Sequence, residues 1–120
     1  MTTTRQLLGG FGEELAERVL QGLGMEVLAR NWRCEHGEVD FVARDGDCLV
    51  VCEVKTRTGV GFGDPVEAVT FDKMLRLRRL AAAWLRDHAI EGVGTVRVDV
   101  IGVLRRPGER TLIRHVRGDA

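Results

Sequence analysis

The chain has 120 residues, of which 44% are hydrophobic and 30% charged, and its formal net charge is zero. This length suits one domain and is too short for two, so we expect residues 1–120 to form a single domain. The sequence contains no Ser and no Tyr, which excludes serine hydrolases and tyrosine recombinases, and neither lysine follows a glycine as a phosphate-binding loop requires. No apolar run has the length of a signal peptide or a membrane span, and three cysteines cannot all pair. We therefore expect a cytoplasmic protein with reduced thiols and no membrane partner.

The charges are unevenly distributed between the two halves of the chain. Residues 1–64 carry 7 Lys and Arg against 11 Asp and Glu, and residues 65–120 carry 11 against 7. An acidic half beside a basic half suits a cluster of metal-binding carboxylates next to a phosphate-binding surface. A protein with nothing more than a polarised surface would show the same pattern.

Hydrophobic periodicity predicts two helices and five strands. The first helix is predicted over residues 8–23, with one apolar face formed by Phe11, Leu15, Val19 and Leu23. Strands are predicted at residues 25–33, 39–44 and 48–56, followed by a Gly-rich loop at 58–64. The second helix is predicted over residues 70–88, with Thr70 as its N-cap and an apolar face that includes Phe71 and His88. Strands at 95–103 and 111–116 complete the order αβββαββ, which predicts an α/β fold with one central mixed β-sheet flanked by helices.

The strands at 39–44 and 48–56 read as a β-hairpin, because Asp45-Gly46-Asp47 is typical of a tight turn. A turn at Gly46-Asp47 pairs Asp40 with Glu53, and a turn at Asp45-Gly46 pairs Asp40 with Val51. Either register keeps Asp40, Glu53 and Lys55 on one face, because strand side chains alternate between faces. The opposite face is apolar throughout: Val39, Phe41, Ala43, Cys48, Val50, Cys52 and Val54. Cys48 and Cys52 are therefore expected to be buried thiols and not zinc ligands.

Two acids and one lysine on this face leave one carboxylate without a partner. Carboxylates on neighbouring strands are ligands that Mg²⁺ accepts, so we predict that Asp40 and Glu53 bind Mg²⁺ or Mn²⁺. Lys55 would then orient the attacking water or neutralise charge that develops on a phosphate. A cross-strand ion pair, worth less than about 1 kcal/mol, is the structural alternative.

Glu13 is the acid of the first helix that is expected to approach the sheet. At about 100° per residue, Glu13 lies roughly 110° from the centre of the apolar stripe, at its edge. Glu14 and Glu17 lie roughly 150° away and are expected to face solvent. Stabilisation by the helix dipole explains acids in the N-terminal half of the helix equally well.

Several basic residues are candidates for contact with a nucleic-acid backbone. Arg57 continues the face of Glu53 and Lys55, and Lys73, Arg76 and Arg79 lie at or outside the apolar stripe of the second helix. A solvated strand end and a solvated helix face explain these residues equally well.

The motifs taken together resemble the YraN-like family of small bacterial proteins over nearly the whole chain. The family belongs to the PD-(D/E)xK nuclease superfamily and is similar to archaeal Holliday-junction resolvases. The resemblance rests on Gly12-Glu13-x-x-Ala16, Arg30-Asn31-Trp32-Arg33, Gly37-Glu38-Val39-Asp40, Glu53-Val54-Lys55-Thr56-Arg57, Phe62-Gly63-x-Pro65, Lys73 and Arg97-Val98-Asp99-Val100. Val39 stands where the superfamily motif has Pro, a position that commonly varies.

The resemblance implies a restriction-endonuclease-like fold and a Mg²⁺-dependent endodeoxyribonuclease, a hydrolase of DNA with branched or junction DNA among its expected substrates. By this resemblance Asp40, Glu53 and Lys55 match the metal-binding and catalytic positions, and Glu13 matches the acid on the first helix of the resolvases. A homodimer is expected by analogy with resolvases, which cut two strands symmetrically. The alternative is a nucleic-acid-binding or partner-recruiting module that keeps the nuclease fold without cleavage.

Overall fold

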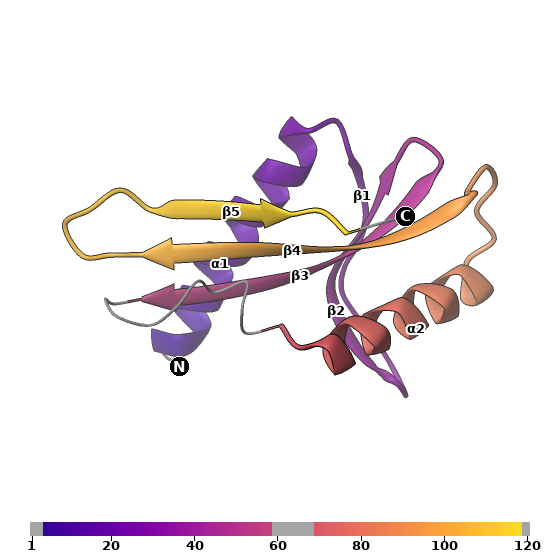
Figure 1. The fold of residues 1–120 in the computed structure, drawn as a ribbon, viewed down its shortest axis with the longest axis horizontal. Helices are drawn as coiled ribbons and strands as arrows, with labels where there is room; N and C mark the ends of the chain where they lie inside the picture. Colours follow the sequence, from indigo (N-terminus) through magenta and orange to yellow (C-terminus); the bar gives the residue numbers. More distant parts are fainter. Residues whose placement is uncertain (1–3, 59–68, 119–120) are drawn as a thin grey trace.

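The computed structural model describes residues 4–58 and 69–118 (Figure 1). The Gly-rich loop predicted at 58–64 and the Phe62-Gly63-x-Pro65 motif lie outside these residues, apart from Thr58. Within the described ranges the elements are α1 (Thr4–Gly22), β1 (Glu26–Cys34), β2 (Gly37–Asp45), β3 (Cys48–Thr58), α2 (Phe71–Asp87), β4 (Thr95–Arg105) and β5 (Leu112–Val116). The predicted order αβββαββ is confirmed, and α1 begins four residues earlier than predicted.

The strands form one mixed sheet in the order β1-β2-β3-β4-β5. β1, β2 and β3 are antiparallel neighbours, β3 and β4 are parallel, and β5 returns antiparallel to β4. The parallel pair needs a long crossover, and α2 lies in that connection. β3 therefore has a strand neighbour on each edge, and its residues 48–52 are buried on both faces because α1 residues pack on one face and α2 residues on the other.

The two helices cover opposite faces of the sheet (Figure 1). Ala16 and Leu20 of α1 pack with one set of strand residues: Phe41, Ala43, Cys48, Val50, Cys52, Ile101 and Val103. Leu77, Leu80, Ala81 and Trp84 of α2 pack with the other set: Val39, Val42, Leu49, Val51 and Val98. Cys48 and Cys52 are buried free thiols, as predicted, and Cys34 is also free.

The buried line of α1 runs through Gly12, Ala16 and Leu20. The predicted stripe had been centred on residues 15–23, and its last member, Leu23, is in fact exposed because the helix ends at Gly22. Gly12 allows the helix to approach β3 closely: a Cβ atom at Gly12 would lie 1.8 Å from Thr56 Oγ1 and 3.1 Å from Thr56 Cβ.

We expect Gly12→Ala to destabilise the fold, because the new methyl group overlaps Thr56 and forces α1 away from the sheet. The expected loss is about 1–3 kcal/mol of unfolding free energy, measured by urea denaturation. The double variant Gly12→Ala/Thr56→Ala removes the nearest overlapping atom and should recover part of this loss. Gly10→Ala, at a helical position with open space around it, is the matched control. Equal stability of Gly12→Ala and Gly10→Ala would contradict the close approach.

The limits of α2 were predicted correctly. Thr70 is its N-cap, with Oγ1 accepting the Lys73 N–H at 3.2 Å, and His88 is its C-cap. The prediction is wrong for two members of the apolar face. Phe71 is 76% exposed at the first helical position, and His88 is exposed, with its ring stacked on Trp84 at a centroid separation of 4.2 Å. Both residues lie at the ends of the helix, outside its buried segment between Leu77 and Trp84.

On β2 the strict alternation of side chains between the two faces of the sheet is broken at Asp40. Strict alternation predicted that Val39 shares a face with Phe41, but Val39 packs with Val42 in the α2 cluster. Arg30 pairs with Phe41 and Trp32 with Val39, so Asn31 lies opposite Asp40. Asn31 has φ of 50°, a left-handed conformation that Asn adopts more readily than most residues. The irregular backbone at Asn31 and the strong twist of a two-stranded ribbon explain the change of face.

Candidate functional site

Asp40 and Glu53 lie across from one another where β2 leaves β3. The register runs from Asp45–Cys48 to Phe41–Cys52, so the turn is at Gly46-Asp47, the first of the two predicted alternatives. Gly46 has φ of 62°, which suits the first central position of a two-residue hairpin turn.

The Asp40 carboxylate receives a backbone hydrogen bond from β3. Val54 N–H donates to Asp40 Oδ2 at 2.7 Å. In a regular antiparallel ladder the next pair to exchange hydrogen bonds after Phe41–Cys52 would be Val39 with Val54. The Asp40 side chain thus takes the place of the main-chain acceptor, which satisfies the Val54 N–H as the strands separate and fixes the carboxylate beside β3.

Two lysines contact the Glu53 carboxylate. Lys55 Nζ lies 3.4 Å from Glu53 Oε1, and Lys73 Nζ, from the first turn of α2, lies 2.8 Å from the same oxygen. The Glu53 side chain is only 8% exposed, so the ammonium groups offset the penalty of burying its charge. The sequence had indicated two acids with one base. That count was wrong, because helix packing brings in Lys73 as a second base.

The surroundings of Asp40 disfavour the ionised form of its carboxyl group. Its burial and then the charge of Glu53 raise the pKa of Asp40 to about 7 from an ordinary 3.8, against the lowering effect of the Val54 hydrogen bond. Glu13 and Glu38 add smaller contributions in the same direction. Burial lowers the pKa of Lys73, but its hydrogen bond to Glu53 and the charges of Glu53 and Asp40 outweigh this and leave that pKa raised.

The donor set limits which metal ion the site can hold. In the described parts of the chain, no three His, Cys, Asp or Glu side chains converge closely enough to hold a metal ion. Two carboxylates, Asp40 and Glu53, remain as candidate protein ligands. Structural Zn²⁺ takes four ligands, often nitrogen or sulfur, and Ca²⁺ takes six to eight oxygens. Mg²⁺ commonly takes one or two carboxylates and keeps its waters, so the residues present fit Mg²⁺ or the similar Mn²⁺.

Glu13 lies closer to the sheet than its predicted angle of roughly 110° indicated. Relative to the buried line through Ala16, Glu13 is rotated by roughly 60° at 100° per residue, and its charge acts on Asp40. It remains outside any group of three metal-binding side chains in the described chain. Glu17, which was expected to face solvent, instead forms a two-point contact with Arg30, with Nε–Oε1 and Nη2–Oε2 distances of 2.5 and 2.6 Å.

The four predicted nucleic-acid contacts occupy different places. Lys73 belongs to the carboxylate cluster. Arg57 is half-exposed at the end of β3, where it pairs in register with Leu104. Arg76 and Arg79 are exposed on α2, and the aliphatic part of Arg76 lies beside Gly37. Lys73 therefore lies near Glu53 in space, and Arg57 lies near it along β3. Arg76 and Arg79 instead form part of the outer surface of α2.

A second charged cluster lies on the other face of the sheet and was not predicted. Asp99 is fully buried and accepts hydrogen bonds from Arg97 Nε at 2.8 Å, Arg97 Nη2 at 3.1 Å and Gly118 N–H at 3.2 Å. His115 Nε2 lies 2.7 Å from Asp99 Oδ2. Arg97 and Arg117 also contact Asp45 Oδ2, at 3.2 and 3.3 Å. The cluster ties the end of β5 to β4, and the charged residues of the apolar strand at 95–103 were its only sequence signal.

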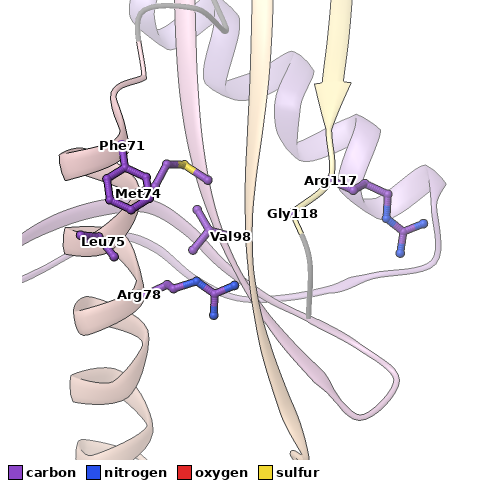
Figure 2. A pocket seen from close by; sticks show the side chains of 7 residues that line it. All are labelled: Phe71, Met74, Leu75, Arg78, Val98, Arg117 and Gly118. Carbon is purple, nitrogen blue, oxygen red and sulfur yellow. The ribbon is translucent and has the colours of Figure 1, made fainter.

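A shallow groove of about 310 Å³ lies between α2, β4 and the end of β5 (Figure 2). It is lined by Phe71, Met74, Leu75, Arg78, Val98, Arg117 and Gly118. In Figure 2 the Arg117 side chain points away from the groove, toward its contact with Asp45. Val98 is two residues from Val100, the register partner of Glu53, so groove and carboxylate cluster lie on the same face. Phe71 and Leu75 give the groove an exposed apolar edge.

The fold and this site define an α/β protein with a mixed five-stranded sheet and a cluster of two acids and two lysines on its α2 face. The profile of the uncharacterised protein family UPF0102 matches residues 12–103. The chain belongs to this family, which confirms the resemblance to the YraN-like group.

Relatives in the family match almost end to end. A UPF0102 protein of Acidothermus cellulolyticus is 56% identical over 97% of this chain and 95% of its own length. Those of Nocardioides sp. and Nocardia farcinica are 53% and 52% identical, over 95% and 94% of this chain and 91% and 88% of their own lengths.

A solved structure, Pyrococcus furiosus SfsA in complex with Ca²⁺, aligns with a TM-score of 0.41 and 14% identity. The alignment covers 92% of this chain, and the chain spans 62% of that protein's length. A TM-score of this size does not establish a common fold. Among the described residues, neither helix has the combination of length and apolar character needed to cross a membrane.

Proposed function

We propose that the protein is a metal-dependent endonuclease that hydrolyses phosphodiester bonds in DNA, with branched or junction DNA as its substrate. The observation that carries the proposal is the meeting of Asp40 and Glu53 at the point where β2 leaves β3, with Lys55 and Lys73 on the same carboxylate. The αβββαββ order is consistent with a restriction-endonuclease-like fold, and the proposal includes that fold, a cytoplasmic location and a homodimer that cuts two strands.

Asp40 and Glu53 would hold Mg²⁺ or Mn²⁺, and the bound ion would supply Lewis-acid activation of water and of the phosphate. Asp40 is held by the Val54 N–H, so its free oxygen has a fixed direction. Lys55 is one-third exposed, and its Nζ lies 3.4 Å from the Glu53 carboxylate. Its ammonium group can donate hydrogen bonds to a non-bridging phosphate oxygen or to the attacking water. Glu13 would complete the site from α1 by orienting water.

Cleavage assays test this proposal. Duplex, single-stranded, flap and four-way-junction DNA are incubated with protein in Mg²⁺, Mn²⁺ or EDTA. We expect cleavage of the junction only with divalent metal, and a loss of roughly 100-fold or more in Glu53→Gln and Lys55→Met. Lys55→Met should retain the metal-induced rise in melting temperature that Glu53→Gln loses, since Lys55 is not a metal ligand.

Matched variants separate site chemistry from general charge effects. Glu13→Gln should reduce cleavage, whereas Glu14→Gln, one residue further along α1 on its exposed side, should not. Arg86→Met removes a cation from the far end of α2, where Arg86 forms only a surface contact with Asp87, and is the control for Lys55→Met. Cleavage that persists in EDTA, or equally in Glu53→Gln, would contradict the proposal.

A second candidate function is nucleic-acid or partner binding without cleavage. The groove with the exposed residues Phe71 and Leu75 favours it, because an exposed aromatic ring can stack on an unpaired base or contact a partner. This function predicts junction binding that weakens steeply with salt, needs no metal and is lost in Phe71→Ala. It is supported if the junction is bound but never cut and the Asp40 and Glu53 variants bind like wild type.

A further inference from the structure

Lys73 makes the shorter of the two lysine contacts with Glu53. Its Nζ is 2.8 Å from Glu53 Oε1, whereas Lys55 Nζ is 3.4 Å from that atom. The Lys73 backbone is fixed by the helix cap, because its N–H donates to Thr70 Oγ1. Only the flexible four-carbon stem lies between this anchored backbone and the ammonium group, so the head can move while the helix stays in place.

The Lys73 side chain is more exposed than the carboxylate that it contacts. The Glu53 side chain is 8% exposed and that of Lys73 is 33% exposed. Lys55 and Lys73 contact the same carboxylate oxygen, and Lys55 is held nearby by its own strand, two residues from Glu53. Glu53 therefore keeps one cationic neighbour if Lys73 leaves, and a cation that approaches Glu53 competes with the Lys73 ammonium.

We infer that Lys73 is an exchangeable counter-ion of the site. Without metal it neutralises Glu53, and when a divalent cation takes that carboxylate, the Lys73 ammonium is released toward an anionic phosphate oxygen of the substrate. This inference rests on the proposed function, because it requires a metal ion at Asp40 and Glu53. It assigns Lys73 to substrate binding at the site itself and not to the outer surface of α2, where Arg76 and Arg79 lie.

The first test measures metal binding alone. Mn²⁺ is titrated into wild type, Lys73→Gln, Lys73→Arg and Arg86→Gln, with free Mn²⁺ followed by electron paramagnetic resonance. Removal of the competing ammonium should tighten Mn²⁺ binding in Lys73→Gln by roughly tenfold, the scale on which neighbours of metal ligands act. Lys73→Arg keeps the charge and should not bind Mn²⁺ more tightly than wild type. Arg86→Gln removes the same charge from the distant end of α2 and should match wild type.

The second test measures association with a four-way DNA junction by fluorescence anisotropy, recorded immediately after mixing. In Mn²⁺, Lys73→Gln should bind the junction more weakly than wild type, because one phosphate contact is lost. In EDTA the two proteins should bind alike, because Lys73 is then held by Glu53. Melting curves in EDTA identify any variant that does not fold, and Lys73→Met, which keeps the apolar stem, replaces Lys73→Gln in that case.

The outcomes separate the inference from the proposed function. If Glu53→Gln loses Mn²⁺ binding but Lys73→Gln binds Mn²⁺ like Arg86→Gln, Lys73 is a fixed structural partner and the inference is wrong, while the metal site stands. An equal loss of junction binding in Mn²⁺ and in EDTA would also overturn the inference. If wild type and Glu53→Gln respond identically to Mn²⁺, the metal site itself is absent and both proposals fail.

Discussion

Asp40→Asn is expected to abolish metal-dependent cleavage and at the same time to make the metal-free protein more stable at pH 8. The carboxylate is buried beside Glu53, and this environment raises the pKa of Asp40 to about 7. The ionised form therefore destabilises the folded state. Asn removes the charge, and its side-chain oxygen can still accept the Val54 N–H that Asp40 accepts at 2.7 Å. Loss of one of the two proposed metal ligands should lower cleavage by roughly 100-fold or more.

The stability difference should depend on pH in a defined direction. Because the pKa of Asp40 is higher in the folded chain than its ordinary value of 3.8, the folded state holds this proton more tightly. The stability that the proton provides is complete below about pH 4 and is lost as the pH rises through about 7. Urea denaturation in EDTA at pH 4, 6 and 8 should therefore show a growing advantage of Asp40→Asn over wild type.

Added metal should reverse this order of stability between wild type and Asp40→Asn. At the proposed site Mg²⁺ would bind the ionised carboxylate, so it should raise the melting temperature of wild type more at pH 8 than at pH 6 and leave Asp40→Asn unchanged. Asp47→Asn, an exposed acid in the turn of the same hairpin, is the matched control and should behave like wild type. Contrary evidence would be an Asp40→Asn variant that is less stable than wild type at pH 8 in EDTA.

Asp99→Ala should cause the largest loss of stability of any single change considered. Asp99 is fully buried and pairs with Arg97, whose side chain is also almost fully buried. Removal of the carboxylate leaves a buried guanidinium without its main partner and also removes the acceptor of the Gly118 N–H. The expected cost is about 3–5 kcal/mol of unfolding free energy, measured by denaturant titration.

A double variant distinguishes a charge effect from a packing effect. Arg97→Met/Asp99→Leu replaces both charges by apolar groups of similar size and should recover most of the stability lost in Asp99→Ala. Arg117→Ala removes an exposed member of the same cluster, and its effect should not exceed about 1 kcal/mol. If the double variant were as unstable as Asp99→Ala, the loss would arise from shape and not from unpaired charge.

The sequence was most informative where local rules act alone. Apolar alternation and the Asp45-Gly46-Asp47 turn predicted the hairpin and limited its register to two alternatives, because hairpin register depends on neighbouring residues, and the structure has the one with the turn at Gly46-Asp47. Thr70 was predicted as the N-cap of α2 because capping needs only a side-chain oxygen before the helix. Glu13 was distinguished from Glu14 by helical spacing, although the buried line of α1 proved to be rotated toward Glu13.

The predictions were wrong where tertiary packing determines the position of a residue. The position of Lys73 at Glu53 depends on how α2 crosses the sheet, which residue spacing within the helix does not encode. Val39 changes face because of the backbone at Asn31 on the neighbouring strand. The cluster around Asp99 joins residues 45, 97, 99, 115 and 117, and such separations lie beyond any periodic pattern.

The central claim is that Asp40 and Glu53 together bind one divalent cation, and crystals of wild-type protein soaked in Mn²⁺ test it most directly. The claim predicts a single anomalous difference peak between the two carboxylates, about 2 Å from an oxygen of each. It also predicts that Lys73 Nζ has moved away from its 2.8 Å contact with Glu53 Oε1. A saturating soak with no anomalous peak at this position, and with both lysines still on Glu53, would contradict the claim.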